Sequence, residues 1–237
     1  STGFIVLVPA SAGQIPLLVT CAHSLNQAMQ LELSCVRASS AGQPEIGQYE
    51  TVRLAVSDFK AVAHESKDLD LVAIPFGPVL NHFQSVGKSL FVKPLPIEVF
   101  LPGQQRAGLN AIEDVIFIGY PLGIHDTANM LPIIRKGISA SPIWGDFEKR
   151  PQFLIDAEVF PGSSGSPVFI LNEGSYPTGD GIVIGTRFYL VGMITQSVSI
   201  ASTAQHVGLG SVLAAEPMRR ELEALVTKLS RQTTDAK

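Results

Sequence analysis

Short apolar stretches with the composition of β-strands fill the first third of the chain. Val, Ile, Leu and Thr are concentrated in them, and Gly, Pro, Asn and Ser punctuate the intervals, as expected of strands joined by turns. No helical spacing of apolar residues continues here for about a dozen residues. The predicted strands are residues 4–9, 17–21, 31–36, 51–55 and 71–75.

A second set of strand-like stretches follows a connecting segment. Residues 93–111 contain three prolines and two glycines, and we interpret them as the connection between two lobes. The pattern predicts an all-β protein and by itself allows either a pair of barrels or a sandwich. The strands predicted after the connection are residues 115–119, 133–143, 153–156, 167–171, 190–196 and 207–212.

The pattern changes near residue 214, where a C-terminal helix is predicted. Glu216 and Pro217 suit a first helical turn, and the tail from Arg231 is polar. Apolar side chains recur every three or four positions, which places them on one face of an α-helix. They are Met218, Leu222, Leu225, Val226 and Leu229.

Composition and charge exclude several classes of protein. Hydrophobic residues make up 46% of the chain and charged residues 16%, so it can bury a core and does not have the composition of a disordered protein. The net charge is −4 and Lys and Arg form no stripe, which argues against nucleic acid as a partner. No apolar run reaches the roughly 18 residues of a membrane span. Because the chain begins at Ser1 and not at Met, we expect it to be trimmed or processed.

The two cysteines, Cys21 and Cys35, lie in predicted strands that could be neighbours, so a disulfide is one interpretation. Small secreted domains carry more bridges, and free thiols are the interpretation we favour. Free thiols favour a reducing, cytoplasmic compartment, while a secreted or periplasmic location stays open. The five histidines and two cysteines show no metal-ligand spacing, so we expect no metal and no other cofactor.

The segment of residues 161–168, Pro-Gly-Ser-Ser-Gly-Ser-Pro-Val, is the strongest chemical signal. A serine hydroxyl is a weak nucleophile and needs a tight turn with a base within reach. The glycines allow unusual dihedral angles and can turn backbone N–H groups toward a substrate carbonyl. A simple turn between two strands is the plainer interpretation of these residues alone.

A histidine and an aspartate complete the constellation. His23 ends an apolar strand after Val-Thr-Cys-Ala, and Asp70 directly precedes another, Leu-Val-Ala-Ile. Such an acid can orient an imidazole and stabilise its charged form. Asp68 is the competitor, and we interpret it as a solvated turn residue. His23, Asp70 and Ser164 follow one another in this order, with gaps of 47 and 94 residues. Each residue alone is a modest signal, but the order and spacing together firmly indicate a catalytic triad.

The chain resembles the chymotrypsin-like serine proteases, nearest to the bacterial HtrA/Deg-type and glutamyl-endopeptidase-type branches. The resemblance runs from residue 2 to about residue 212. Besides the nucleophile segment, the similar stretches are residues 2–6, 19–23, 70–74, 118–123, 137–140, 156–160 and 191–195. The family motif Gly-x-Ser-Gly selects Ser164 as nucleophile over Ser163 and Ser166.

The resemblance implies a fold and a function. The fold is two six-stranded antiparallel β-barrels, at residues 1–100 with His23 and Asp70 and at residues 112–213 with Ser164, followed by a helix at 214–231. The implied activity is that of a serine endopeptidase on polypeptide substrates, with an oxyanion hole formed by the N–H groups of Gly162 and Ser164. The resemblance leaves open whether the protein forms a homo-oligomer or has further domains.

Substrate-binding residues are also implied by the resemblance. Strand residues Thr195, Gln196 and Ser197 correspond to the segment that pairs with an extended substrate. For the residue before the scissile bond, Val159 in the pocket favours small or aliphatic side chains and Glu158 favours basic ones. His206 favours acidic ones. Strand alternation does not decide among them without the register.

The chain also departs from its relatives. Ser163 stands where trypsin-like zymogens have the aspartate that pairs with a newly freed N-terminus, so we expect no activation by that route. HtrA-type proteins continue into a peptide-binding PDZ domain, whereas this chain ends in the predicted helix. Two alternatives remain: a catalytically silent peptide- or partner-binding module of the same fold, and an α/β-hydrolase using Ser164, Asp180 and His206. The second requires a helix after Ser164, where we predict a strand.

Overall fold

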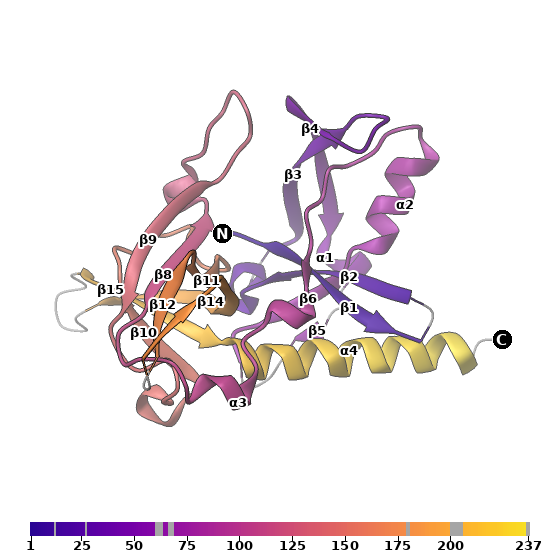
Figure 1. Cartoon of the computed structure of the whole chain (residues 1–237). Coiled ribbons are helices and arrows are strands. Elements are labelled where there is room, and N and C mark those ends of the chain that lie inside the picture. The colour runs from indigo at the N-terminus through magenta and orange to yellow at the C-terminus, as the bar shows by residue number, and fades with distance from the viewer. Residues whose placement is uncertain are drawn as a thin grey trace. The chain divides into compact units, whose positions relative to one another are not determined.

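The computed structural model describes residues 1–11, 13–26, 28–59, 64–65, 69–178, 181–199 and 206–235 (Figure 1). Side chains are described for these residues except 64, 65, 206 and 232–235. The chain divides into two compact units. We call residues 1–3, 98–123 and 133–220 the barrel unit, and residues 4–97, 124–132 and 221–237 the sheet unit. The lobe boundaries expected from the sequence, at residues 1–100 and 112–213, stay a prediction.

Six antiparallel strands close into a barrel in the barrel unit, in the order β10-β15-β14-β11-β8-β9 (Figure 1). Pairing of β10 with β9 completes the circle through Ile155 and Ser139. Inward positions carry apolar side chains, as in the alternating burial of β8. The strands are β8 (Asp114–Gly119), β9 (Ile133–Ser139), β10 (Gln152–Asp156), β11 (Pro167–Asn172), β14 (Arg187–Ser199) and β15 (His206–Ala214).

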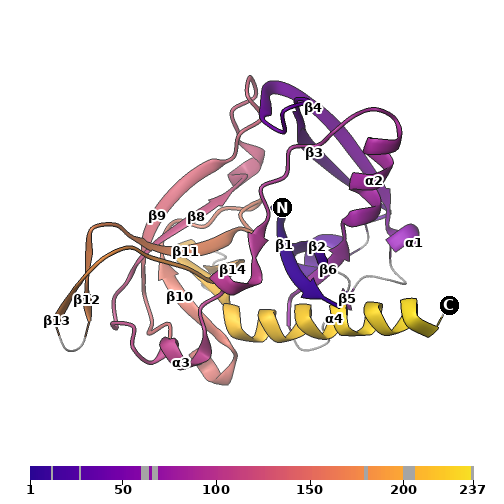
Figure 2. The same ribbon diagram turned by 45° about the vertical axis from the view of Figure 1, so that its right-hand side comes forward.

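A two-stranded hairpin, β12 (Ser175–Thr178) and β13 (Gly181–Ile184), leaves the barrel between β11 and β14 (Figure 2). The sequence analysis did not predict it. At its base the buried Arg187 forms an ion pair with Glu113, Nη2 to Oε2 at 2.5 Å. The guanidinium group also donates to the side chain of Asn172 at 2.8 Å and lies over the ring of Tyr176.

The Glu113–Arg187 pair gives a prediction about stability. Glu113→Ala should lower the free energy of unfolding by about 3–5 kcal/mol, because it leaves the Arg187 charge buried without its partner. Arg53→Ala is the control, since Arg53 and Glu32 form an exposed pair worth at most about 1 kcal/mol. Urea denaturation of both variants measures the difference. Equal losses would contradict the assignment of a structural role to the buried pair.

The sheet unit contains a five-stranded sheet in the order β5-β6-β2-β1-β7 and a separate hairpin of β3 and β4. All pairs in the sheet are antiparallel except β1 with β7. Its strands are β1 (Phe4–Ala10), β2 (Gly13–Thr20), β5 (His64–Glu65), β6 (Val72–Pro75) and β7 (Leu95–Pro96), and the hairpin is β3 (Gln30–Ala38) with β4 (Pro44–Ala55).

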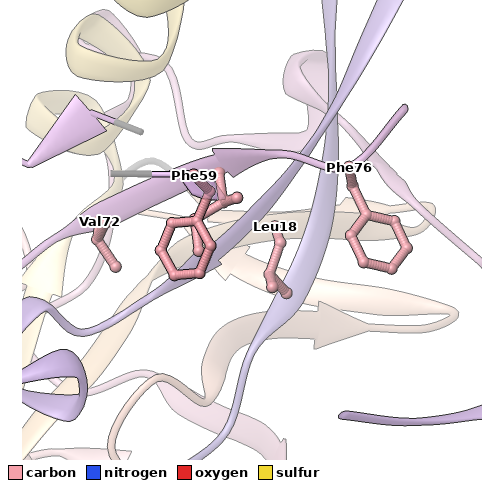
Figure 3. Packing of buried hydrophobic residues seen from close by; sticks show 5 residues of the cluster. Leu18, Phe59, Val72 and Phe76 are labelled. Carbon is pink, nitrogen blue, oxygen red and sulfur yellow. The ribbon is translucent and has the colours of Figure 1, made fainter. Parts of the chain in front are cut away.

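An apolar cluster between the sheet and its flanking segments forms a core of the sheet unit (Figure 3). Leu18 and Val72 come from the paired strands β2 and β6, and Phe76 follows β6 directly. Phe59 ends helix α1 (Val56–Phe59), which follows β4. Burial of apolar surface in this cluster therefore stabilises the packing of α1, the segment after β4, on the five-stranded sheet.

The remaining elements are short, apart from the last helix. Helix α2 (Gly77–Ser85), which the sequence analysis missed, has a proline in its first turn and packs Val79 and Leu80 on the apolar cluster. The others are η1 (Ala22–Leu25), η2 (Ile97–Val99), α3 (Gly103–Arg106), η3 (Pro121–Gly123) and η4 (Phe147–Lys149).

The C-terminal helix α4 (Ala215–Asp235) is confirmed, a few residues longer than predicted. The mostly-β fold with a closed six-stranded barrel is also confirmed. A second closed barrel stays a prediction, since no strand pairing joins the β3–β4 hairpin to the five-stranded sheet within the described residues. A strand, β11, follows Ser164, where an α/β-hydrolase would require a helix. None of the described helices has the length and apolar character of a membrane-spanning helix.

Candidate active site

The candidate nucleophile Ser164 lies in a tight turn between β10 and β11 of the barrel unit. Gly162 and Gly165 flank it with φ angles of 95° and 89°, a region that favours glycine. Ser163 and Ser166 are buried at 1% and 0% exposure, and the structure shows no hydrogen-bond partner for their hydroxyl groups among the described residues. Ser164 is partly exposed. Of the three serines it is therefore the one that a substrate can reach.

The backbone N–H groups of the turn fall into two classes. Those of Ser163, Gly165 and Ser166 donate to backbone carbonyls at 2.7–3.0 Å. Those of Gly162 and Ser164 have no acceptor within the described part of the chain. Two unengaged donors beside an accessible hydroxyl are what stabilisation of an oxyanion requires.

A second loop, residues 120–123, packs against the turn that carries Ser164. Leu122 donates its N–H to the carbonyl of Pro161 at 2.6 Å and has a φ of 54°, which is strained for a residue with a side chain. The two loops approach so closely that a Cβ atom on Gly162 would lie 2.4 Å from the carbonyl oxygen of Tyr120. Only glycine fits at this contact.

The close approach predicts a large effect of Gly162→Ala. The added methyl group would push the turn away from Tyr120, and we expect kcat to fall by at least about 100-fold, the cost of losing one oxyanion donor. Gly174→Ala is the matched control, because Gly174 also has a positive φ, 85°, but nothing within 4 Å of a new Cβ. Steady-state kinetics on both variants gives the comparison. Similar losses in the two variants would mean that backbone strain alone is responsible.

His23 and Asp70 are brought together by strand pairing in the sheet unit. His23 lies in η1 at the end of β2, Asp70 precedes β6, and β2 pairs with β6 up to Thr20 and Val72. The imidazole Nδ1 lies 2.6 Å from Asp70 Oδ2, and the backbone N–H of His23 donates to Oδ1 at 2.9 Å. With the carboxylate as acceptor, Nδ1 carries the proton and Nε2 has a free lone pair. Asp68, the competitor, lies outside the described residues.

Neither Cys21 nor Cys35 forms a disulfide in the structure. Burial raises the pKa of the Cys35 thiol to about 11, so that it is protonated near neutral pH. Cys21 is buried, and its sulfur belongs with His23 and Asp70 to a group whose candidate ligand atoms lie within 4.8 Å of one another. A metal ion bound there through Nδ1 would displace the hydrogen bond to Asp70. Metal binding through Nδ1 and an imidazole oriented by Asp70 therefore exclude each other.

The predicted substrate strand has one open edge. Thr195, Gln196 and Ser197 lie in β14, and Gln196 and Ser197 pair with β15 on one side. On the other side β11 pairs with β14 only as far as Met193, so residues 195–197 have no partner strand there among the described residues. Such an edge can accept an extended peptide.

The other predicted substrate-binding residues have different environments. Val159 is buried at 4% exposure and packs against Gly210, whereas the side chain of Glu158 is exposed. His206 begins β15, and its side chain is not among those described. The assignment of any of these residues to substrate binding stays a prediction.

Sequence reasoning missed two residues that contact the nucleophile turn. Arg135 donates to the carbonyl of Glu158, and its guanidinium group lies 5.3 Å from the ring centroids of Phe117 and Phe160. Thr2 donates to the carbonyls of Gly162 and Ser164. The stretch that contains Thr2 was recognised as similar to the family, but no pattern in it indicates a contact 160 residues away.

The class of the protein is identified by a match to a known family. A family model described as trypsin-like peptidase domain matches residues 1–176, most of the chain. The chain belongs to this family, and the resemblance found in the sequence is confirmed. Membership places it among the serine protease hydrolases.

No curated protein sequence matches the chain significantly. Among solved structures, the HtrA-type protease AlgW with a decapeptide is similar, at 14% identity and a TM-score of 0.48, over 90% of this chain and 49% of that chain. An inactive mutant of Rv3671c from M. tuberculosis H37Rv has 14% identity and a TM-score of 0.41, over 92% of this chain and 84% of that chain. The chain thus spans about half the length of the AlgW chain. At such TM-scores the fold rests on the strand pairing described above.

Proposed function

We propose that the chain is a serine endopeptidase that hydrolyses peptide bonds through an acyl-enzyme on Ser164. His23 is the general base and Asp70 orients its imidazole. The observation that carries the proposal is the two-point hold of Asp70 on His23, through Nδ1 at 2.6 Å and the backbone N–H at 2.9 Å, in a member of a peptidase family. An imidazole held in this tautomer is a base with its lone pair on Nε2.

The reaction proceeds in two halves. Nε2 of His23 removes the proton of the Ser164 hydroxyl as the oxygen attacks the substrate carbonyl carbon. The developing oxyanion accepts hydrogen bonds from the N–H groups of Gly162 and Ser164. The imidazolium gives its proton to the leaving amine, and water repeats the sequence to release the acid. The mechanism requires Nε2 to come within hydrogen-bond reach, about 3 Å, of the Ser164 oxygen in the productive state.

The substrate is a polypeptide in extended conformation. The open edge of Thr195–Ser197 supports pairing with the substrate backbone, which is independent of sequence. Because Glu158 is exposed and Val159 is packed against Gly210, we favour Glu158 over Val159 as the side chain available to a substrate. That choice favours a basic residue before the scissile bond.

A silent binding module of the same fold is the second candidate function. Such a module would keep the open strand edge and would need neither the oriented imidazole nor the free N–H groups of the turn. A peptide-library digest followed by mass spectrometry separates the two functions. We expect cleavage, with enrichment of Lys or Arg before the scissile bond. Peptide binding without cleavage, by protein that is shown to be folded, would establish the silent module.

A further inference from the structure

The turn that carries Ser164 is held by the second residue of the chain. Thr2 belongs to the barrel unit and is buried at 4% exposure. Its N–H donates to the carbonyl of Ser164 at 2.8 Å, and its hydroxyl donates to the carbonyl of Gly162 at 2.9 Å. The same hydroxyl oxygen accepts the N–H of Tyr120 at 3.1 Å. Thr2 thus connects the nucleophile turn with the loop of residues 120–123.

The other two carbonyls of the turn are restrained by nearby residues. Leu122 donates to the Pro161 carbonyl at 2.6 Å, and Ser166 donates to the Ser163 carbonyl at 2.9 Å. In a planar trans peptide the C=O and the N–H point in opposite directions. Each of these two bonds therefore also orients the N–H group of the residue that follows the carbonyl. Those N–H groups belong to Gly162 and Ser164, the two unengaged donors of the site.

Thr2 restrains the next peptide plane along the chain after each donor. Gly162 and Ser164 each lie between two peptide planes, and Thr2 fixes the second plane through the carbonyl group. A glycine at φ 95° resists rotation of its planes only weakly, so the hydrogen bond to its carbonyl is a main restraint on its ψ angle. The N–H of Ser163, at the other end of this plane, donates to the carbonyl of Phe160 at 3.0 Å. Without Thr2 the plane between Gly162 and Ser163 is held at that end alone, and the two donors lose part of the restraint on their common direction.

We propose that Thr2 is a positioning residue for catalysis, whose hydroxyl and N–H hold the turn in the conformation that presents both oxyanion donors. This rests on the proposed function and adds Thr2 to the residues that function requires. A charged partner is not needed for it. Ser163 has a neutral, buried hydroxyl without a hydrogen-bond partner among the described residues, and Thr2 reaches the same turn through neutral hydrogen bonds.

The test is Thr2→Val, which keeps the shape of the side chain and removes the hydroxyl. The oxyanion forms only after attack, so we expect kcat to fall by about 100-fold with KM nearly unchanged. Affinity for a peptide boronate, which forms a tetrahedral adduct, should fall by a similar factor. Thr2→Ser retains the hydroxyl and should restore kcat to within about threefold of the wild type.

Ser139→Ala is the matched control. Ser139 is another buried residue of the barrel unit, and its hydroxyl has the same double role, accepting the N–H of Glu113 at 2.9 Å and donating to the carbonyl of Ala111 at 3.2 Å. This variant should lose as much thermal stability as Thr2→Val and keep its kcat. Equal kcat values in Thr2→Val and wild type, measured below both melting temperatures, would overturn the proposal.

Two further results keep the test decisive. If Thr2→Val does not fold, Thr2→Cys is compared with Thr2→Ser, since the two differ only in sulfur for oxygen and a thiol is a weak donor. We expect kcat at least about tenfold lower for the cysteine variant, and equal values would overturn the proposal. A wild-type protein that neither cleaves peptides nor reacts with a fluorophosphonate would instead refute the proposed function. The two failures are therefore distinguishable.

Discussion

Ser164→Ala should reduce kcat by about 10⁶-fold and leave the fold intact, because removal of the nucleophile removes the covalent step on which the other two residues act. The change deletes one oxygen from a partly exposed side chain, so little packing is lost. Steady-state hydrolysis of the best peptide from the library digest measures the loss, with urea denaturation as the check on folding.

Ser163→Ala and Ser166→Ala are the controls for this variant. Both hydroxyl groups are buried without hydrogen-bond partners among the described residues, so their removal should leave the fold stable and the activity largely intact. If either control lost activity while Ser164→Ala kept it, the identity of the nucleophile would be wrong.

Asp70→Asn should reduce kcat by about 10⁴-fold with little effect on KM. The backbone N–H of His23 would still bind the amide oxygen, which turns the NH₂ group toward Nδ1. Nδ1 would then have to accept, the ring proton would move to Nε2, and the imidazole could no longer take a proton from Ser164. A kcat/KM measurement at several pH values follows the loss.

Asp68→Asn controls for the general effect of removing a negative charge two positions from Asp70 in the sequence, and it should be nearly silent. Comparable losses in the two variants would leave the orienting acid undetermined between them. Retained activity in Asp70→Asn would show that the Asp70 carboxylate, which lies 2.6 Å from the imidazole, is not the orienting acid.

The parts of the fold that the sequence predicted are those set by local pattern. Short stretches enriched in Val, Ile, Leu and Phe located the barrel strands, and the spacing of apolar residues located α4. His23 and Asp70 could be paired in advance because each stands at the end of a strand, and antiparallel pairing of β2 with β6 brings those ends together.

The features that the sequence did not predict depend on long-range contacts or on weak local signals. Helix α2 has nine residues, with a proline in its first turn, so its apolar spacing is too brief to detect. Thr2 acquires its role only when the fold places it against residues 162–164, because a threonine before a strand has no distinguishing pattern. The β3–β4 hairpin was predicted as strands, but strand composition does not determine which sheet a hairpin joins.

The most direct test of the central claim is covalent modification of the wild-type protein by a fluorophosphonate, followed by intact-mass measurement and peptide mapping. The account predicts one phosphonyl group per chain, on the oxygen of Ser164, and no modification in His23→Ala, where the base that activates the hydroxyl is missing. An adduct on Ser163 or Ser166, or folded wild-type protein that acquires no adduct at all, would contradict it.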